Sequence, residues 1–123
     1  MKQKLPSARE AKKYFHDKVC FSTGPAELYQ QIKQHDPSIN IIDVRSGNDF
    51  EKGHIPHACS LPMNKWSTMQ GLQKDKVNIV YCYHEDCHLA AKAALQFAEK
   101  GFPVMELDGG WASWQQGHFD VET

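Results

Sequence analysis

Three short apolar runs dominate the pattern of hydrophobic and polar residues along the chain. Each run has four or five residues and is bounded by polar or turn-forming residues, which is typical of a strand buried on both faces of a parallel sheet. The predicted strands are residues 40–44, 77–81 and 104–107. Residues 19–22 and 58–61 are predicted to add two further short strands.

The N-terminal segment has the apolar spacing of a helix. Ser7 followed by Glu10 fits a capping box, and apolar residues three and four positions apart extend the helical pattern to about Lys18. We therefore expect an N-terminal helical extension, residues 1–18, that forms a covering layer on a domain of residues 19–123.

The order of the remaining elements indicates the fold class. A second helix is predicted to begin at Gly24 and to end before Pro37, and a third is predicted over residues 87–100. Alternating strands and helices favour an α/β domain with a small, mainly parallel sheet. The carboxyl ends of such strands meet at one edge, where functional groups gather. Residues 43–45, 82–87 and 108–110 are placed at this edge.

Composition and charge narrow the classes of partner. The chain has 123 residues, of which 41% are hydrophobic and 24% charged, as in a globular domain with one core. Its 14 Lys and Arg against 15 Asp and Glu leave no basic excess for nucleic acid. No stretch approaches the roughly 20 apolar residues of a membrane span, and the first residues lack the apolar core of a secretion signal. We therefore expect a cytoplasmic protein without a membrane partner.

The four cysteines do not have the pattern of a disulfide scaffold, because the chain is long enough to bury its own core. Cys20 and Cys59 are expected in or near that core. Cys82 and Cys87 differ from them, since they bound a short polar segment between the strand 77–81 and the third helix.

The position of Cys82 changes the chemistry expected of its thiol. Cys82 stands at the carboxyl end of a predicted strand, about five residues before a predicted helix. Backbone N–H groups of such a loop, together with the positive end of the helix, form an anion site that lowers the pKa of a thiol below about 8.5. A nucleophilic cysteine is therefore one interpretation. The alternative from position alone is a small buried apolar residue.

Three stretches, taken in their order along the chain, resemble the rhodanese-like domain family. The first is IIDVRSGNDFEKGHIPHA (residues 41–58), the second is the Cys82 loop with its Ala-rich helix, and the third is VMELDGGWASW (residues 104–114). The resemblance covers about residues 21–117. It implies a rhodanese-like α/β fold, with helices on both faces of a small parallel sheet and an extra helix at the N-terminus.

The resemblance implies a sulfurtransferase with Cys82 as its catalytic residue. In this family the loop cysteine takes a sulfane sulfur from a donor such as thiosulfate and holds it as a persulfide. A thiophilic acceptor, such as cyanide or a thiol of a small molecule or protein, then removes the sulfur. The anion site is built from backbone, so neither a cofactor nor a metal is expected. The related phosphatases use a loop one residue longer that ends in Arg, whereas this loop closes at Cys87.

The interior of the loop departs from the family pattern. Many sulfurtransferase members have Gly in the middle of this loop and a hydroxyl or basic residue within it. Here the active-site loop continues after Cys82 with Tyr83, His84, Glu85, Asp86, Cys87 and His88. Two carboxylates beside an anion site oppose an anionic donor, so we expect weak binding of thiosulfate and a preference for a neutral or protein-bound persulfide.

Cys87 leaves a second interpretation of the loop open. A Cys82–Cys87 disulfide is possible where the two α-carbons approach to about 4.4 to 6.8 Å, and it would make sulfur transfer redox-responsive. Cys87 can equally begin the helix with its thiol turned inward. The alternative function is therefore a non-catalytic module that uses the Cys82–Cys87 loop for redox sensing, metal binding or docking to a partner.

The histidines beside these cysteines invite a metal interpretation, which we do not favour. Cys82, His84, Cys87 and His88 are all possible zinc ligands, but structural zinc sites usually draw ligand pairs from two separated segments. His84 is expected at the solvent-exposed rim of the loop, and His88 on a helix face.

Asp43 and Arg45, after the strand 40–44, have two interpretations. They form an ordinary strand end, with Arg45 bonding Asp49, or they brace the neighbouring loop, with the carboxylate accepting backbone N–H groups. Position favours the supporting role. His54 is predicted to be a buried polar anchor. At least two of the three tryptophans are expected in the core, with a pocket wall as the alternative; they are Trp66, Trp111 and Trp114.

Overall fold

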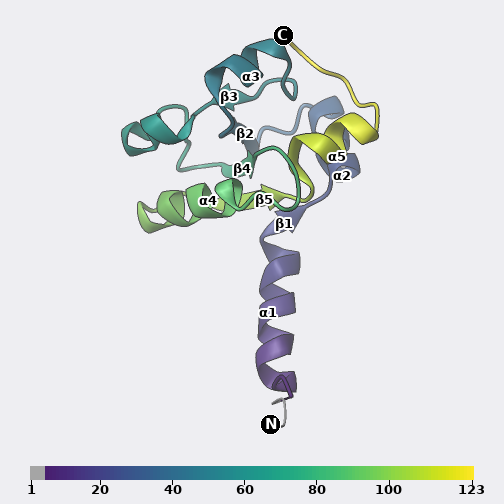
Figure 1. The fold of residues 1–123 in the computed structure, drawn as a ribbon, viewed down its shortest axis with the longest axis vertical. Coiled ribbons are helices and arrows are strands. Elements are labelled where there is room, and N and C mark those ends of the chain that lie inside the picture. Colours follow the sequence, from purple (N-terminus) through teal and green to yellow (C-terminus); the bar gives the residue numbers. More distant parts are fainter. Residues whose placement is uncertain (1–4) are drawn as a thin grey trace.

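The computed structural model describes residues 5–123 and shows a parallel five-stranded sheet with helices on both faces (Figure 1). The strands are β1 (Ser22–Thr23), β2 (Ile39–Asp43), β3 (Cys59–Ser60), β4 (Val77–Tyr81) and β5 (Val104–Leu107). Their spatial order is β1-β5-β4-β2-β3, and each neighbouring pair is parallel. The predicted fold class is therefore confirmed.

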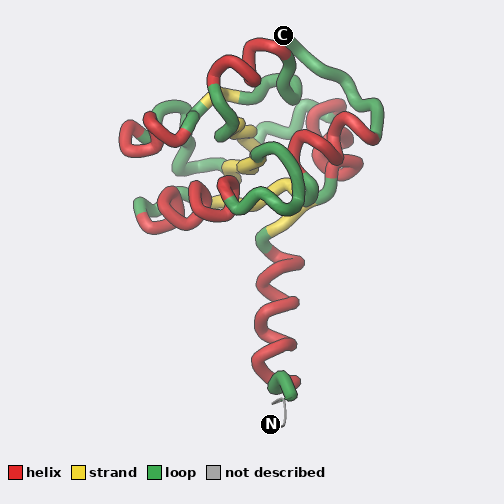
Figure 2. Tube along the Cα trace, in the orientation of Figure 1, coloured by secondary structure: helices red, strands yellow, loops and turns green. Residues whose placement is uncertain are grey.

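Helices cover both faces of this sheet, and one further helix projects away from it (Figure 2). They are α1 (Ala8–Cys20), α2 (Pro25–Lys33), α3 (Gly47–Lys52), the 3-10 helix η1 (Met63–Thr68), α4 (Leu89–Glu99) and α5 (Gly110–Gln116). The helices α4 and η1 pack on one face of the sheet, and α2 and α5 pack on the other. Within the described residues, no helix combines the length and the apolar composition needed to cross a membrane.

The central strands bury side chains on both faces. Ile42 and Val80 face the α4 side, whereas their neighbours Ile41 and Ile79 face the α2 side. This alternation follows from the two-residue repeat of a strand, and burial on both faces explains the continuous apolar runs in the sequence.

Two of the three tryptophans lie in the core, as expected. Trp66 is buried on the α4 side of the sheet and Trp114 on the α2 side. Trp111 is half-buried and stacks on the Tyr81 ring. His54 is buried, and its Nδ1 lies 2.8 Å from the Phe50 carbonyl oxygen, which agrees with the predicted polar anchor.

Several predicted boundaries need correction. Predicted and observed ranges agree for β4 and β5, but α4 begins at Leu89, two residues later than expected. The short helices α3 and η1 were not predicted, because six residues are too few to show a helical repeat. Ser46 caps α3 by accepting the Asp49 N–H, at a distance of 3.2 Å.

The first helix does not form the expected covering layer. Helix α1 continues to Cys20, and the first strand is Ser22–Thr23, which shares only Ser22 with the predicted residues 19–22. Only Phe21 separates α1 from β1, so the chain has no room to turn back over the sheet. The helix therefore projects as a stalk (Figure 1), with none of its residues buried. Cys20 is exposed, contrary to the expectation of a core position.

A buried polar network joins the ends of β2 and β4. The Asp43 carboxylate accepts hydrogen bonds from Arg45 Nε and Nη2 at 2.8 to 3.1 Å, and from the Tyr81 hydroxyl at 2.6 Å. Arg45 Nη2 also donates to the Gly53 carbonyl oxygen at 2.7 Å. Asp43 is fully buried and Arg45 is 3% exposed, so each charge depends on the other for compensation.

We predict that Asp43→Ala lowers the free energy of unfolding by about 3 to 5 kcal/mol, because Arg45 would keep a buried charge without its partner. Urea unfolding followed by tryptophan fluorescence measures the change. The matched control is Asp75→Ala, at an exposed position, which should change stability by less than about 0.5 kcal/mol. Equal stability of the two variants would contradict a structural role for the network.

Candidate active site

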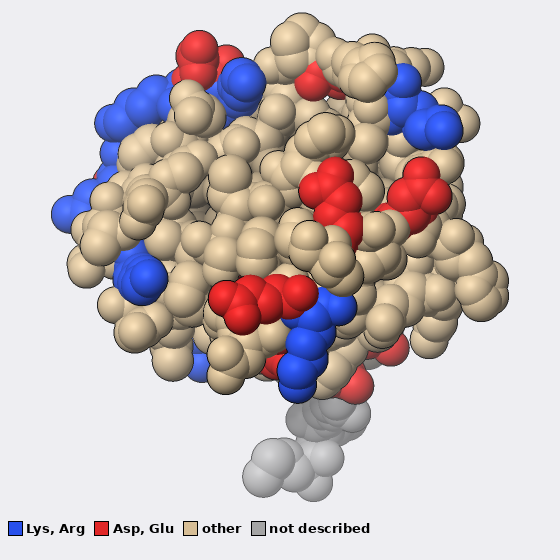
Figure 3. All heavy atoms as spheres, turned by 90° about the horizontal axis from the view of Figure 1, so that it is seen from above, with Lys and Arg blue, Asp and Glu red and all other residues tan. Residues whose placement is uncertain are grey.

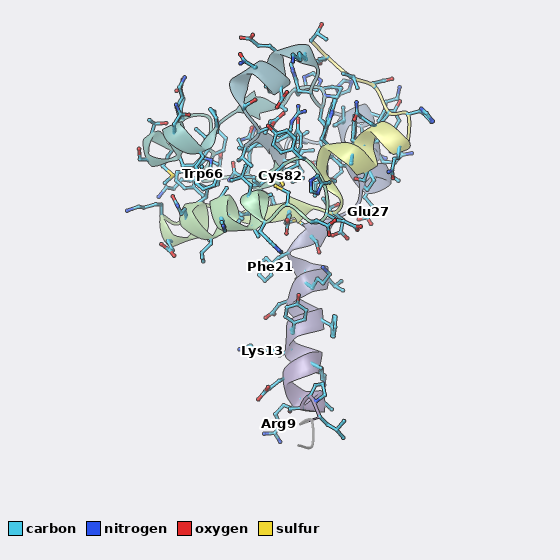
Figure 4. All side chains as sticks on the ribbon, viewed as in Figure 1. Arg9, Lys13, Phe21, Glu27, Trp66 and Cys82 are labelled. Atoms are coloured by element: carbon cyan, nitrogen blue, oxygen red, sulfur yellow. The ribbon has the colours of Figure 1, made fainter. Side chains whose placement is uncertain are left out.

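The predicted active-site loop lies at the carboxyl end of β4, in the middle of the domain (Figure 4). Cys82 follows the strand directly and is 2% exposed. Backbone N–H groups of Tyr83 and Ala90 point to its sulfur, so the loop and the first turn of α4 both reach the thiol. Because α4 begins late, His88 lies in the turn before the helix rather than on the predicted helix face.

The start of α5 holds the loop from the other side. The N–H groups of Trp111 and Ala112 donate to the carbonyl oxygens of Cys82 and Tyr83, both at 2.8 Å. Gly110 makes this approach possible, since a Cβ there would lie 2.7 Å from the Cys82 carbonyl oxygen. Its φ of +56° also favours glycine. In the sequence, the signal for this contact was the Gly109–Gly110 pair within VMELDGGWASW.

Arg45 contacts the loop through aromatic rings. Its guanidinium carbon lies 4.4 Å from the Trp111 ring centre and 5.9 Å from that of Tyr83. The expected alternative contact with Asp49 is not formed; Asp49 instead accepts a hydrogen bond of 2.6 Å from the Tyr83 hydroxyl. The Asp43 carboxylate accepts the backbone N–H of Arg45 at 2.9 Å, in the turn after β2, but no N–H group of the Cys82 loop. It also orients the Arg45 side chain, which lies against the rings of Trp111 and Tyr83.

The ionisation of the two loop thiols differs from the expectation. Burial, followed by the hydrogen bond with Cys87, raises the pKa of Cys82 to about 11, although the Ala90 and Tyr83 N–H groups oppose this shift. The prediction of a lowered pKa at Cys82 is therefore wrong, because desolvation outweighs the loop amides. Burial also opposes ionisation of Cys87, but hydrogen bonds from Cys82 and from backbone N–H groups lower the pKa of Cys87.

The loop forms one wall of a cavity of about 760 Å³. The charged side chains that line it are Lys18, Glu85, Asp86, Glu106 and Asp108. Burial and the nearby Asp108 raise the pKa of Glu106. With one lysine against four carboxyl groups, the cavity is unfavourable for an anionic ligand.

The helix α1 supplies part of the same cavity. Tyr14 and Lys18 line it together with Cys82 and the loop. Sequence reasoning missed both residues, because they lie outside the segments that resemble a known family and their nearness to Cys82 depends on the direction of the α1 stalk.

The histidines and cysteines of the loop do not converge. His84 is exposed at the rim, as expected, and His88 is also exposed. Across residues 5–123, no group of three or more His, Cys, Asp or Glu side chains is placed to hold a metal ion. All four cysteines are free thiols, so the Cys82–Cys87 disulfide stays a prediction.

Fold and site together define an α/β protein with a cysteine loop at the carboxyl end of its central strand. A model of the Rhodanese-like domain matches residues 24–117. The chain therefore belongs to the rhodanese-like domain family. The match leaves α1 outside the family domain.

Relatives of known name and structure agree with this assignment. The chain is 34% identical to the thiosulfate sulfurtransferase GlpE of Shewanella oneidensis over 66% of its own length and 80% of the relative. Identity to GlpE of Coxiella burnetii is also 34%, over 75% of this chain and 84% of the relative. A crystal structure of the BH2092 protein from Bacillus halodurans is 38% identical, with a TM-score of 0.84 over 94% of this chain and 86% of that one.

We predict that Cys87→Ala makes Cys82 more reactive at neutral pH, since the hydrogen bond and charge of Cys87 both raise the pKa of Cys82. With a pKa of about 11, half of the parent Cys82 is thiolate only near pH 11, and the variant should reach the same fraction at lower pH. Rates of iodoacetamide alkylation, measured by peptide mass from pH 6 to 11, test this. Cys59→Ala is the control that should leave the profile unchanged. An unchanged profile in Cys87→Ala would contradict the coupling of the two thiols.

Proposed function

We propose that the protein is a sulfurtransferase that carries sulfane sulfur as a persulfide on Cys82. The observation that carries this proposal is the position of Cys82 in a cavity wall, with loop and helix N–H groups at its sulfur. Membership of the rhodanese-like family and the names of the GlpE relatives support the same reaction class.

The proposed reaction has two steps at one sulfur atom. The Cys82 thiolate attacks the outer sulfur of thiosulfate, the S–S bond of the donor breaks, and sulfite leaves with the electron pair. Cys82 then holds a persulfide. An acceptor such as cyanide attacks the outer sulfur, thiocyanate leaves, and the Cys82 thiolate is restored. No net oxidation or reduction of the protein occurs, and the steps require no cofactor and no metal.

The surroundings of Cys82 support its role as the nucleophile. The Tyr83 and Ala90 N–H groups point to the Cys82 sulfur and would stabilise its thiolate before the attack and after the sulfur is released. Asp43 and Arg45 act as supporting residues, since Arg45 fixes the rings on which the loop rests. The remaining loop residues, Tyr83 to His88, shape the opening of the site.

The acidic cavity favours a neutral or protein-bound donor over free thiosulfate. Glu85 and Asp86 lie in the cavity wall, and Lys18 is the lysine that faces them from α1. A small-molecule or protein thiol is the proposed acceptor, with no role for nucleic acid or membrane. A reducing compartment such as the cytoplasm would keep both loop thiols available.

The contact between Cys82 and Cys87 favours a second candidate function. The two thiols share a hydrogen bond, and the Cys82 thiol also lies 3.4 Å from the Cys87 carbonyl oxygen. Oxidation to a disulfide would remove the nucleophile reversibly, so the same loop suits a redox-sensing module.

The central test is Cys82→Ser, which should abolish loading with sulfur because the attacking thiolate is removed. Intact mass after incubation with thiosulfate or a small persulfide measures a gain of one sulfur atom that cyanide removes. Cys20→Ser, at an exposed position outside the loop, is the matched control and should load like the parent. Loading of Cys82→Ser at the parent rate, together with its loss in Cys87→Ser, would assign the nucleophile to Cys87 instead.

A second test concerns donor preference. Two unit charges about 7 Å apart at an effective dielectric of about 20 to 80 repel enough to change binding by about three-fold to fifty-fold. We therefore predict that Glu85→Gln and Glu85→Gly raise kcat/KM for thiosulfate several-fold at low salt, and that added salt narrows the difference. A neutral organic trisulfide should show little change.

The control for donor preference is Glu51→Gln, an exposed substitution on α3. Glu85 does not provide a side-chain cap for α4, so neutralising it removes no such bond. Thiosulfate kinetics that stay unchanged across salt would contradict the proposed effect of the acidic loop.

A further inference from the structure

Helix α1 exposes large apolar side chains that residues 5–123 leave uncovered. Tyr14, Phe15 and Val19 are 60%, 59% and 78% exposed, and no residue of α1 is buried. Isolated helices shorter than about 12 to 15 residues are marginally stable in water. Since α1 has 13 residues, packing of its exposed apolar side chains against another surface would stabilise the helix.

An apolar groove lies open at the base of the same helix. It has a volume of about 340 Å³ and runs between α4 and β5, with Phe21, Ala91, Leu95, Ala98 and Met105 in its walls. Phe21 and Leu95 are 59% and 62% exposed. Figure 4 shows Phe21 at the junction of α1 with the domain, on the side of α4. The small alanine side chains leave room for a helix to approach α4 closely.

The net charge differs in sign between the first 20 residues of the sequence and the rest of the chain. Residues 1–20 contain six Lys or Arg and two Asp or Glu, whereas residues 21–123 contain eight and thirteen. The two parts therefore have net charges of +4 and −5. Arg9 and Lys13 lie far from the domain along the stalk (Figure 4), so they cannot neutralise the acidic cavity of their own copy.

The face of the domain opposite α1 also carries acidic side chains. In the view from above, acidic side chains stand nearer the middle of the face, and most Lys and Arg lie towards its edge (Figure 3). Close to the groove, Glu106 lines both the groove and the acidic cavity. One chain thus has a basic helix with exposed apolar side chains and an acidic domain with an apolar groove. Because α1 projects away from the domain, the two surfaces do not meet within one copy.

We propose that two copies of the chain form a two-fold dimer, in which α1 of each copy packs into the apolar groove beside α4 of the other. The two-fold axis runs across the α1 helices, so the two helices point in opposite directions and each lies along the domain of the other copy. Phe15 and Val19 then meet Leu95 of the second copy, and the basic residues of α1 approach its acidic cavity. Because α1 also contributes Tyr14 and Lys18 to its own cavity, the dimer fixes one wall of each site.

The first measurement is the molecular mass in solution, by sedimentation over concentrations of about 1 to 200 µM. We expect a dimer whose Kd rises at least about tenfold in Val19→Glu and in Leu95→Glu, since each places a charge in an apolar contact. Both positions are exposed in the single copy, so the variants should fold normally, which circular dichroism checks. Met63→Glu, at a residue that is also 62% exposed but lies in η1, is the matched control and should dimerise like the parent.

The second measurement tests which surfaces meet. Parent protein labelled with ¹⁴N is mixed with protein labelled with ¹⁵N, and a carbodiimide joins neighbouring lysine and carboxyl groups. We expect cross-links between isotopes that join Lys12 or Lys13 to Glu106 or to other carboxyl groups of the acidic cavity. Cross-links confined to one isotope would overturn the reciprocal arrangement.

Three results would overturn the proposal. The first is a monomer throughout the concentration range. The second is a dimer that neither Val19→Glu nor Leu95→Glu weakens. The third is a monomer that binds vesicles containing 30% anionic phospholipid through α1, which would identify a membrane surface as the occupant. None of these results depends on sulfur transfer by Cys82, so the two proposals fail separately.

Discussion

The buried ion pair between Asp43 and Arg45 is the interaction on which the arrangement of the site depends. A buried charge is tolerated only when its partner and its hydrogen bonds are held in place. The pair therefore fixes the end of β2 relative to Tyr81 on β4 and to the carbonyl oxygen of Gly53. Arg45 extends the same constraint to the loop through the ring of Trp111. One network thus sets the distance between the sheet, α5 and the cysteine loop.

The site combines a loop that hydrogen bonds hold in place with a Cys82 thiol whose pKa is raised by burial. The N–H groups of the loop and of α4 are aimed at the Cys82 sulfur, but the sulfur is also withdrawn from water. Desolvation has the larger effect on the free thiol. The amides of the loop and of α4 therefore reduce the pKa shift of Cys82 without cancelling it.

Much of the fold could be predicted from local sequence, and the failures have physical causes. The strands β4 and β5 were predicted because both faces are buried, which leaves an uninterrupted apolar run. The helices α3 and η1 were missed because they are too short to repeat a pattern. The start of α4 was placed two residues early, since the turn that ends at Cys87 and the first helical turn have similar local signals.

The sequence by itself determined the order of the strands and the longer helices, the position of Cys82 at a strand end and the family to which the chain belongs, because these depend on residues close together in the chain. Only the tertiary structure decided that Cys87 is the more acidic thiol, that α1 lines the cavity, and that Arg45 lies against the rings of Trp111 and Tyr83. Desolvation and contacts between distant segments control these properties, and both exist only after the chain has folded.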